Sequence, residues 1–347
     1  MFIDLHQQSW QNYQMFRFLL FLAIFVTPNL AYALENDLSK AVILSYHRID
    51  EPEHIESSLS FEQFAAHIKE IQSGEYNVLP LNDIIPALKN NQELPPKTIA
   101  ITFEGGYRSI NAKALPLLIE NNIPFTIFIA SNATKIPTHL DWRALKGITK
   151  YNGASFGILP ADHKHITQLD KPEITRLINK SRIDFKENMG FESKLFAYPF
   201  GEISSTLQNI IKTQGFEAAF GTHSGPAHSQ SNMSALPRFT MTDQYADLDR
   251  FRMITNTLPL SVKEIEPQDW QIRESLTQIG FTLSNNLNSK SLSCHISGQA
   301  KPVIETIENR IEIIPKEPII DRTRLNCTLP AHQGDQKQWR WLGMLFH

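Results

Sequence analysis

A single carboxylate stands at the end of a strongly apolar segment, and two glycines follow it directly. The segment Thr98–Phe103 is rich in β-branched and apolar residues, which predicts a buried strand, and Glu104 comes next, before Gly105 and Gly106. Glycine removes side-chain bulk and permits unusual backbone angles. Parallel α/β folds place reactive groups at the carboxyl ends of such strands. Glu104 is therefore a candidate general base, although a solvated glutamate in a turn would have the same local sequence.

Polar residues follow other apolar segments in the same way. They are Tyr46-His47, Gly157–His163, Phe196–Gly201 and Gly221–His228. The carboxyl ends of parallel barrel strands meet on one face, so we expect these groups to lie near Glu104. Histidine often transfers protons near neutral pH, which makes His223 and His228 candidates for a general acid; capping of the Gly-Pro turn between them explains the pair equally well.

The segments that position these residues alternate between strand and helix. We expect strands at 41–49, 77–81, 98–104, 124–130, 154–159, 195–201, 218–222 and 236–241. We expect helices at 60–74, 83–89, 107–120, 141–150, 170–190 and 205–213. Ser60 with Gln63, and Asp170 with Glu173, have the spacing of a helix capping box. This alternation predicts parallel βα units, and seven or eight strands favour a barrel, closed or incomplete.

The pattern changes near Pro267, beyond which short strand candidates are separated by turn residues. These candidates are 280–283, 291–296, 310–314, 324–329 and 339–346. They predict a small all-β domain of the sandwich type, with residues 249–268 as the connection. We therefore divide the chain into a barrel at 34–258 and a linker with β-domain at 259–347. Trp339 and Trp341 alternate in the last strand, which favours packing in the core over stacking on sugar rings.

The N-terminal segment has the composition of an export signal. An apolar core, Phe18–Val26, follows Arg17, and Ala31-Tyr-Ala33 has the small-x-small pattern of a cleavage site. We expect residues 1–33 to be a signal peptide, cleaved near Ala33, and the mature protein to be periplasmic or secreted; a retained membrane anchor is the alternative. An oxidising compartment then favours one disulfide between Cys294 and Cys327 over two buried thiols.

The overall composition excludes some classes of partner. Of the 347 residues, 41% are hydrophobic and 20% charged, which is an ordinary globular composition. The formal net charge is −3 and the sequence has no run of lysine and arginine. Nucleic acid and anionic membrane surfaces are therefore poor candidates.

Four motifs in order carry a resemblance to a known family. Tyr46–Arg48, Thr102–Gly106, Gly157–His163 and Tyr198–Gly201 resemble the polysaccharide deacetylase family, the NodB-homology domain of carbohydrate esterase family four. The resemblance covers roughly residues 40–245 and is nearest to the subgroup that acts on exopolysaccharide glucosamine. It implies an irregular (β/α)₇-type barrel, the glycoside hydrolase/deacetylase fold. It also implies hydrolysis of N-acetyl groups on an amino-sugar polysaccharide, which would be the partner at the cell envelope.

The metal-binding motifs depart from the family pattern. In the family, Thr-Phe-Asp-Asp-Gly supplies the general base and one ligand, and two histidines of His-x-x-x-His complete a site for zinc or another divalent ion. Here Glu104 takes the place of the base, Gly105 and Leu159 replace two ligands, and only His163 is retained. A lone histidine does not hold zinc, because zinc sites use three or four protein ligands. A different metal site would need Glu104, His163 and a third ligand from His47, His165, His223 or Asp162.

We also expect residues at positions matched by the resemblance, and Arg238 from its side-chain type, to line a substrate pocket. These are His47, Trp142, Tyr198, Pro199, Phe200 and Arg238. Trp142 would pack in the core equally well, and a structural salt bridge is the simpler role for Arg238. The arginine usual in the third motif is Ala197 here, at a position that varies in the family. Two hypotheses follow: a hydrolase with Glu104 as base, or an inactive member that binds polysaccharide or serves its assembly or export.

Overall fold

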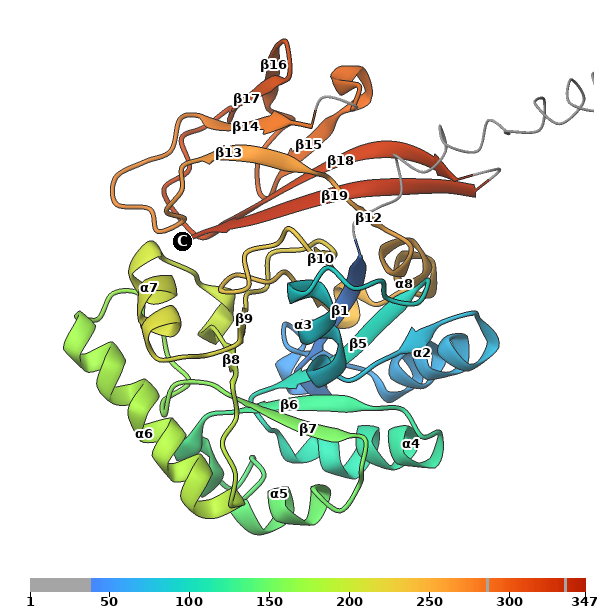
Figure 1. Cartoon of the computed structure of the whole chain (residues 1–347), viewed down its shortest axis with the longest axis vertical. Helices are drawn as coiled ribbons and strands as arrows, with labels where there is room; N and C mark the ends of the chain where they lie inside the picture. The colour runs from blue at the N-terminus through green and yellow to red at the C-terminus, as the bar shows by residue number, and fades with distance from the viewer. Residues whose placement is uncertain (1–38, 285–286, 334–335) are drawn as a thin grey trace, which may run out of the picture. The chain divides into compact units, whose positions relative to one another are not determined.

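The computed structural model describes residues 39–284, 287–333 and 336–347 (Figure 1). The predicted signal peptide at 1–33 lies outside these ranges. Within them, no helix combines the length and the apolar character that crossing a bilayer requires. Residues 39–347 form one compact unit, so the domain boundary at 258/259 stays a prediction.

A nine-stranded sheet forms the barrel, in the order β10-β1-β5-β6-β7-β8-β9, with β4 paired to β5 and β11 to β1. Every pairing is parallel except that of β10 with β1. The strands are β1 (Lys40–Tyr46), β4 (Asn77–Val78), β5 (Thr98–Glu104), β6 (Phe125–Ile129), β7 (Ala154–Ile158), β8 (Leu195–Ala197), β9 (Ala218–Phe220), β10 (Ala227–His228) and β11 (Phe239–Thr240). A separate parallel pair consists of β2 (Arg48–Ile49) and β3 (Ser58–Leu59).

The segment that leads into β11 joins the two ends of this sheet. Leu236 forms a parallel bridge with Phe220 of β9, and Phe239 lies opposite Leu44 of β1. The first and last strands are therefore connected through a few residue pairs only, which makes the closure irregular. The predicted irregular (β/α)₇-type barrel is confirmed.

Most helices pack on the outer side of the sheet (Figure 1), whereas α3 (Leu81–Lys89) belongs to the apolar cluster of the other side, with Ile43 and Ala100. The others are α2 (Phe61–Ser73), α4 (Leu115–Glu120), α5 (Trp142–Ile148), α6 (Lys171–Met189), α7 (Ser205–Thr213) and α8 (Leu248–Thr255). The two predicted caps are present, since the Ser60 side chain accepts from the Gln63 N–H and Asp170 from Glu173. The helix expected at 107–120 instead begins with a π-helical turn at Ile110–Ala114. Pro116, which has no N–H to donate, follows that turn and accounts for the widened hydrogen bonding.

Two four-stranded sheets follow, in the orders β12-β19-β18-β15 and β13-β14-β17-β16. Their strands are β12 (Leu258–Pro259), β13 (Val262–Glu266), β14 (Ile279–Leu283), β15 (Ser293–Ile296), β16 (Val303–Ile307), β17 (Arg310–Ile314), β18 (Thr323–Gln333) and β19 (Gln336–Phe346). Residues of both sheets, among them Phe281 and Leu325, share one apolar core, as in a β-sandwich. The expected connection at 249–268 was wrong in part, because it contains most of α8, β12 and β13. The mostly exposed β13 lacks the apolar alternation that marks a strand.

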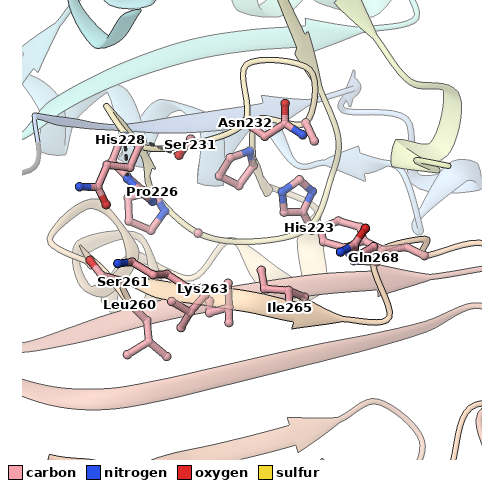
Figure 2. A pocket seen from close by; sticks show the side chains of 18 of the residues that line it. His223, Pro226, His228, Ser231, Asn232, Leu260, Ser261, Lys263, Ile265 and Gln268 are labelled. Atoms are coloured by element: carbon pink, nitrogen blue, oxygen red, sulfur yellow. Dashed lines mark hydrogen bonds between the residues drawn. The ribbon is translucent and has the colours of Figure 1, made fainter. Parts of the chain in front are cut away.

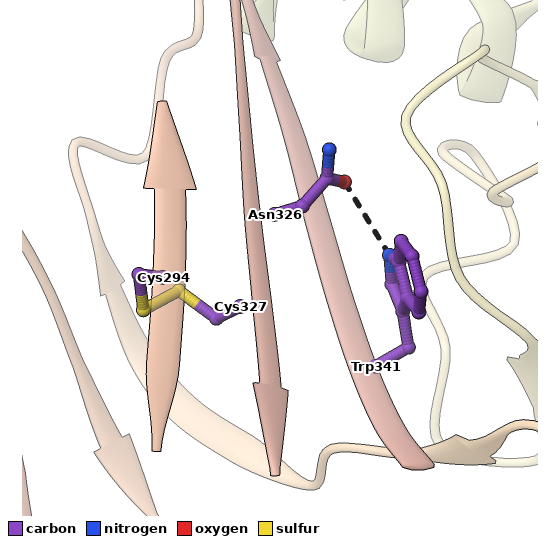
Figure 3. Close-up of a disulfide and its surroundings, with 4 residues drawn as sticks. All are labelled: Cys294, Asn326, Cys327 and Trp341. Carbon is purple, nitrogen blue, oxygen red and sulfur yellow. Dashed lines mark hydrogen bonds between the residues drawn. A yellow bond between two sulfur atoms is a disulfide. The ribbon is translucent and has the colours of Figure 1, made fainter. Parts of the chain in front are cut away.

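The predicted disulfide is confirmed. Cys294 of β15 and Cys327 of β18 are bonded to each other and lie opposite each other in the same sheet (Figure 3). Both residues are buried in the sandwich core. The bond therefore joins two strands that are 33 residues apart in the sequence.

Replacing both cysteines, Cys294→Ser with Cys327→Ser, should lower the free energy of unfolding by about 3–4 kcal/mol, because a loop of this length gains chain entropy in the unfolded state. Urea denaturation of the variant measures this. Wild-type protein treated with a reductant is the matched comparison and should lose a similar amount. A loss below about 1 kcal/mol would show that the bond contributes little.

Candidate site at the carboxyl ends of the barrel strands

The Glu104 carboxylate forms an ion pair with Arg238 inside the barrel. Arg238 Nη2 lies 2.5 Å from Glu104 Oε2, and both side chains are fully buried. The Nε–H of Arg238 donates to the carbonyl of Gly221 at 2.8 Å. The guanidinium also lies 5.3 Å from the centre of the Phe128 ring and 6.0 Å from that of Phe220. A cation therefore stands beside Glu104, supplied by the protein itself.

The fold brings these two residues together from distant segments. Glu104 is the last residue of β5, and Arg238 directly precedes β11, 134 positions later. The pairing of β11 with β1, which in turn pairs with β5, carries Arg238 across the barrel. The sequence offered Arg238 as a pocket residue or salt-bridge partner but gave no indication that Glu104 was the partner.

The ion pair sets the protonation of Glu104. Burial alone would raise the pKa of Glu104, but the Arg238 guanidinium and His163 act in the opposite direction and lower it to about 2. The carboxylate is therefore ionised at neutral pH. A general base works best when its pKa lies near the working pH, so a carboxylate of such low pKa is a weak one.

Two histidines complete the surroundings of Glu104. His163 Nε2 lies 3.5 Å from Glu104 Oε1, and burial lowers the pKa of His47 to about 4, which keeps that ring neutral. Among the described residues, Glu104 Oε1, His163 Nε2 and His47 Nδ1 have no hydrogen-bond partner. Glu104 has no exposed surface, whereas 17% of the His163 side chain is exposed. A molecule arriving from solvent would therefore meet His163 before Glu104.

The exposed edge of the site is an aromatic stack formed by His163, Phe200 and His165. The Phe200 ring lies 4.9 Å from that of His163 and 4.2 Å from that of His165, nearly parallel to both. His165 Nδ1 is 2.9 Å from the Glu202 carboxylate, and 57% of the His165 side chain is exposed. Phe200 has a φ of 57°, a left-handed conformation that bulky residues rarely adopt and that clusters at functional sites.

Other predicted site residues have contacts within the fold. Tyr198 is fully buried and its hydroxyl donates to the Ser234 carbonyl at 2.7 Å. Pro199 is also buried. Trp142 packs edge to face on Phe185, with 6.2 Å between ring centres, so its contacts are those of a core residue. These three residues support the fold beneath the site, and Phe200 alone of the third motif reaches its edge.

The two predicted acid candidates lie elsewhere. His223 packs edge to face on Trp270 at 4.8 Å, and His223 and His228 both line a cavity of about 790 Å³ beside α7 (Figure 2). Within the described part of the chain, neither forms a hydrogen bond or ion pair with Glu104. The structure therefore brings together Glu104, His163, His47 and Arg238. The two later histidines face another cavity, although the backbone N–H of Arg238 donates to the His223 carbonyl at 3.0 Å.

The two positions at which the family has metal ligands are occupied here by residues without ligand atoms. Gly105 has a φ of +98°, and a side chain there would place its first carbon 2.6 Å from a ring atom of Tyr107. Leu159 is fully buried in an apolar cluster. Sequence reasoning did not single out Tyr107, whose ring occupies the space that a ligand at position 105 would need.

The remaining residues do not replace the missing ligands. Over residues 39–284, 287–333 and 336–347, the one group of three His, Asp or Glu ligand atoms close enough to share an ion is Glu51, Glu53 and His54. It includes neither Glu104 nor His163, and Glu51 already forms an ion pair with Arg48. The divalent ion of this family therefore does not fit the residues around Glu104.

Comparison with known proteins shows which family this chain resembles. Residues 91–219 match the family model of polysaccharide deacetylases. The poly-β-1,6-N-acetyl-D-glucosamine N-deacetylase of Staphylococcus aureus is 23% identical over 232 residues, which cover 59% of this chain and 80% of that protein.

Solved structures have the same barrel. The Streptococcus pyogenes deacetylase PplD, in complex with acetate, matches with a TM-score of 0.58 and 19% identity over 62% of this chain and 98% of its own. IcaB from Ammonifex degensii matches with a TM-score of 0.54 and 21% identity, covering 61% of this chain and 96% of its own. The fold is thus that of NodB-type deacetylases. The family model matches residues 91–219, and these relatives support a NodB-type member of the polysaccharide deacetylase family.

Replacing Arg238 with leucine should lower the free energy of unfolding by about 3–5 kcal/mol, because it leaves the buried Glu104 carboxylate without its counter-charge. The double variant Glu104→Leu with Arg238→Met removes both charges and should recover most of that loss. Urea denaturation of the three proteins measures it. Lys186→Met, which breaks an exposed ion pair with Glu192, is the control and should change stability little. Equal losses in the single and double variants would contradict a coupled ion pair.

Purified protein incubated with Zn²⁺ and then desalted should retain far less than one ion per chain, because the site lacks two ligands and contains a fixed cation. Gly105→Asp with Leu159→His restores the family ligands by type only. It should also fail to bind zinc stoichiometrically, because the Tyr107 ring occupies the space beside position 105. In addition, the positive charge of Arg238 would repel the ion. Elemental analysis by mass spectrometry measures the bound metal, and one zinc ion per wild-type chain would refute this assignment.

Proposed function

We propose that this protein binds an N-acetylated amino-sugar polymer through its deacetylase barrel without hydrolysing it. The ion pair between Glu104 and Arg238 carries this proposal. Hydrolysis in the family depends on a carboxylate base and a metal that polarises the acetyl group. Here the carboxylate is buried, ionised and bound to an arginine, and the metal positions are Gly105 and Leu159. The free carboxylate base and the metal ligands that hydrolysis requires are therefore missing, while the barrel is retained.

The aromatic stack of His163, Phe200 and His165 supports sugar binding at the edge of the site. Flat rings suit the apolar face of a pyranose, and the imidazoles add hydrogen-bonding groups beside it. His165 is oriented by Glu202, so its ring is held in place before a ligand arrives. The Staphylococcus aureus relatives act on poly-β-1,6-N-acetyl-D-glucosamine, which makes that polymer the first ligand to test.

The predicted export signal supports a location outside the cytoplasm for this binding. The apolar segment Phe18–Val26 and the Ala31-Tyr-Ala33 pattern are those of a cleaved signal peptide. The disulfide between Cys294 and Cys327 suits an oxidising compartment. We infer a periplasmic or secreted protein that acts at the cell envelope.

Deacetylation without the family metal is the second candidate. It is favoured by the buried Glu104 Oε1 and His163 Nε2, which face each other at 3.5 Å. In that case His163, which is partly exposed, would have to pass a proton between Glu104 and a bound water.

The test uses the mature chain, residues 34–347, and short β-1,6-linked N-acetylglucosamine oligomers. Calorimetry should show binding, and an acetate assay should show no release above buffer, with or without added Zn²⁺. His165→Ala should weaken binding about fivefold, the loss expected for one stacking contact of about 1 kcal/mol. The exposed His295, on β15 of the sandwich, provides the matched control His295→Ala, which should leave binding unchanged.

Acetate release that disappears in Glu104→Gln would establish the enzyme instead. Absence of binding to any N-acetylated oligomer by a folded protein would refute both candidates.

A further inference from the structure

A second concave site lies away from Glu104. The cavity of about 790 Å³ is open to solvent and is lined by residues of α7, of the chain between β9 and β11, of the segment from β12 to Trp270, and of β19 (Figure 2). This volume is within the range of small-molecule sites. Neither Glu104, His163 nor Phe200 lines it, so it is separate from the site at the strand ends.

A buried histidine forms part of its wall. His223 is 6% exposed, and its Nδ1 has no hydrogen-bond partner among the described residues. Burial lowers the pKa of His223 to about 3 and that of His228 to about 4, so both rings are neutral. A neutral imidazole offers one donor and one acceptor, so the part of the His223 ring that lines the cavity adds hydrogen-bonding capacity to its wall.

Amide side chains reach the cavity from two separate segments. Asn209 of α7 and Gln268 are exposed lining residues, and no side-chain hydrogen bond of either is present within the described part of the chain. Trp270 also lines the cavity, and its ring contacts that of His223. The apolar part of the lining consists of Pro226, Ala235, Pro237, Leu260, Val262, Ile265, Trp270, Trp341 and Leu342.

The chemistry of the lining selects an uncharged ligand. Arginine, the residue most suited to carboxylate and phosphate, is absent from the described lining. Lys212 and Lys263 are exposed. Glu264 adds a negative charge, and its carboxylate already accepts a hydrogen bond from the Thr282 hydroxyl. Free amides, neutral imidazoles, serine hydroxyls and an aromatic ring are the groups that recognise hydroxyls and acetamides.

We propose that this cavity is a second binding site, which takes an uncharged, N-acetylated oligosaccharide segment between the barrel and the C-terminal sheets. The identity of the sugar rests on the proposed function, because the same polymer would occupy both sites. Asn209, Gln268 and His223 donate to and accept from its hydroxyl and acetamide groups, and Trp270 packs on an apolar face of the sugar.

The test compares cavity and edge variants with the same probe, a β-1,6-linked N-acetylglucosamine oligomer. Asn209→Ala with Gln268→Ala should weaken calorimetric binding about tenfold, whereas the exposed amide pair Gln92→Ala with Asn152→Ala should bind as wild type does. Hydrogen exchange should show that the oligomer protects residues 223–232 and 260–270. A polyuronate oligomer of the same length should bind at least tenfold more weakly.

The outcomes separate the two proposals. Unchanged affinity in the Asn209/Gln268 variant, with His165→Ala still weakened, would overturn the cavity site and leave the edge site standing. Weakening in the cavity variant alone would support the cavity and refute the edge site. Tighter binding of the polyuronate would overturn the uncharged ligand class. Protection of neither segment at saturating oligomer would overturn the cavity proposal whatever the affinity.

Discussion

The buried ion pair between Glu104 and Arg238 is the interaction on which the rest of the site depends. A carboxylate in an apolar barrel is stable only when a counter-charge compensates its lost hydration. In metal-dependent deacetylases of this fold a divalent ion can supply positive charge nearby. Here a guanidinium does so from within the chain. The same contact that permits Glu104 to be buried also keeps it ionised and occupies one of its oxygens.

The ion pair in turn requires the irregular closure of the barrel. Arg238 reaches Glu104 because the short β11 pairs with β1, and because Leu236 bridges to β9. The C-terminal sheets then support the loops at the strand ends. Arg322 donates to the Phe200 carbonyl at 2.7 Å, and Arg324 donates to the carbonyl of Thr222. The left-handed turn at Phe200, and with it the aromatic stack, is therefore held by residues more than a hundred positions away.

Most of the fold could be predicted where local patterns are strong. The caps at Ser60 and Asp170 and the buried strand that ends at Glu104 follow from spacing and side-chain type alone. Prediction failed where an element is defined by strand pairing or hydrogen bonding that its own residue pattern does not show. The exposed strand β13 is defined by its pairing with β14 and not by apolar alternation. The π-helical turn before α4 depends on how Pro116 changes the hydrogen bonding around it.

The sequence by itself determined which groups are present: one carboxylate at a strand end, one retained histidine, and no ligand atoms at positions 105 and 159. It also determined the family resemblance and the single pair of cysteines. Only the tertiary structure decided that Arg238 is the partner of Glu104, and that His223 and His228 line a separate cavity. The physical reason is that ion pairs and cavities depend on distances in space, and residues far apart in sequence acquire those distances only when the barrel closes and the C-terminal sheets pack against it.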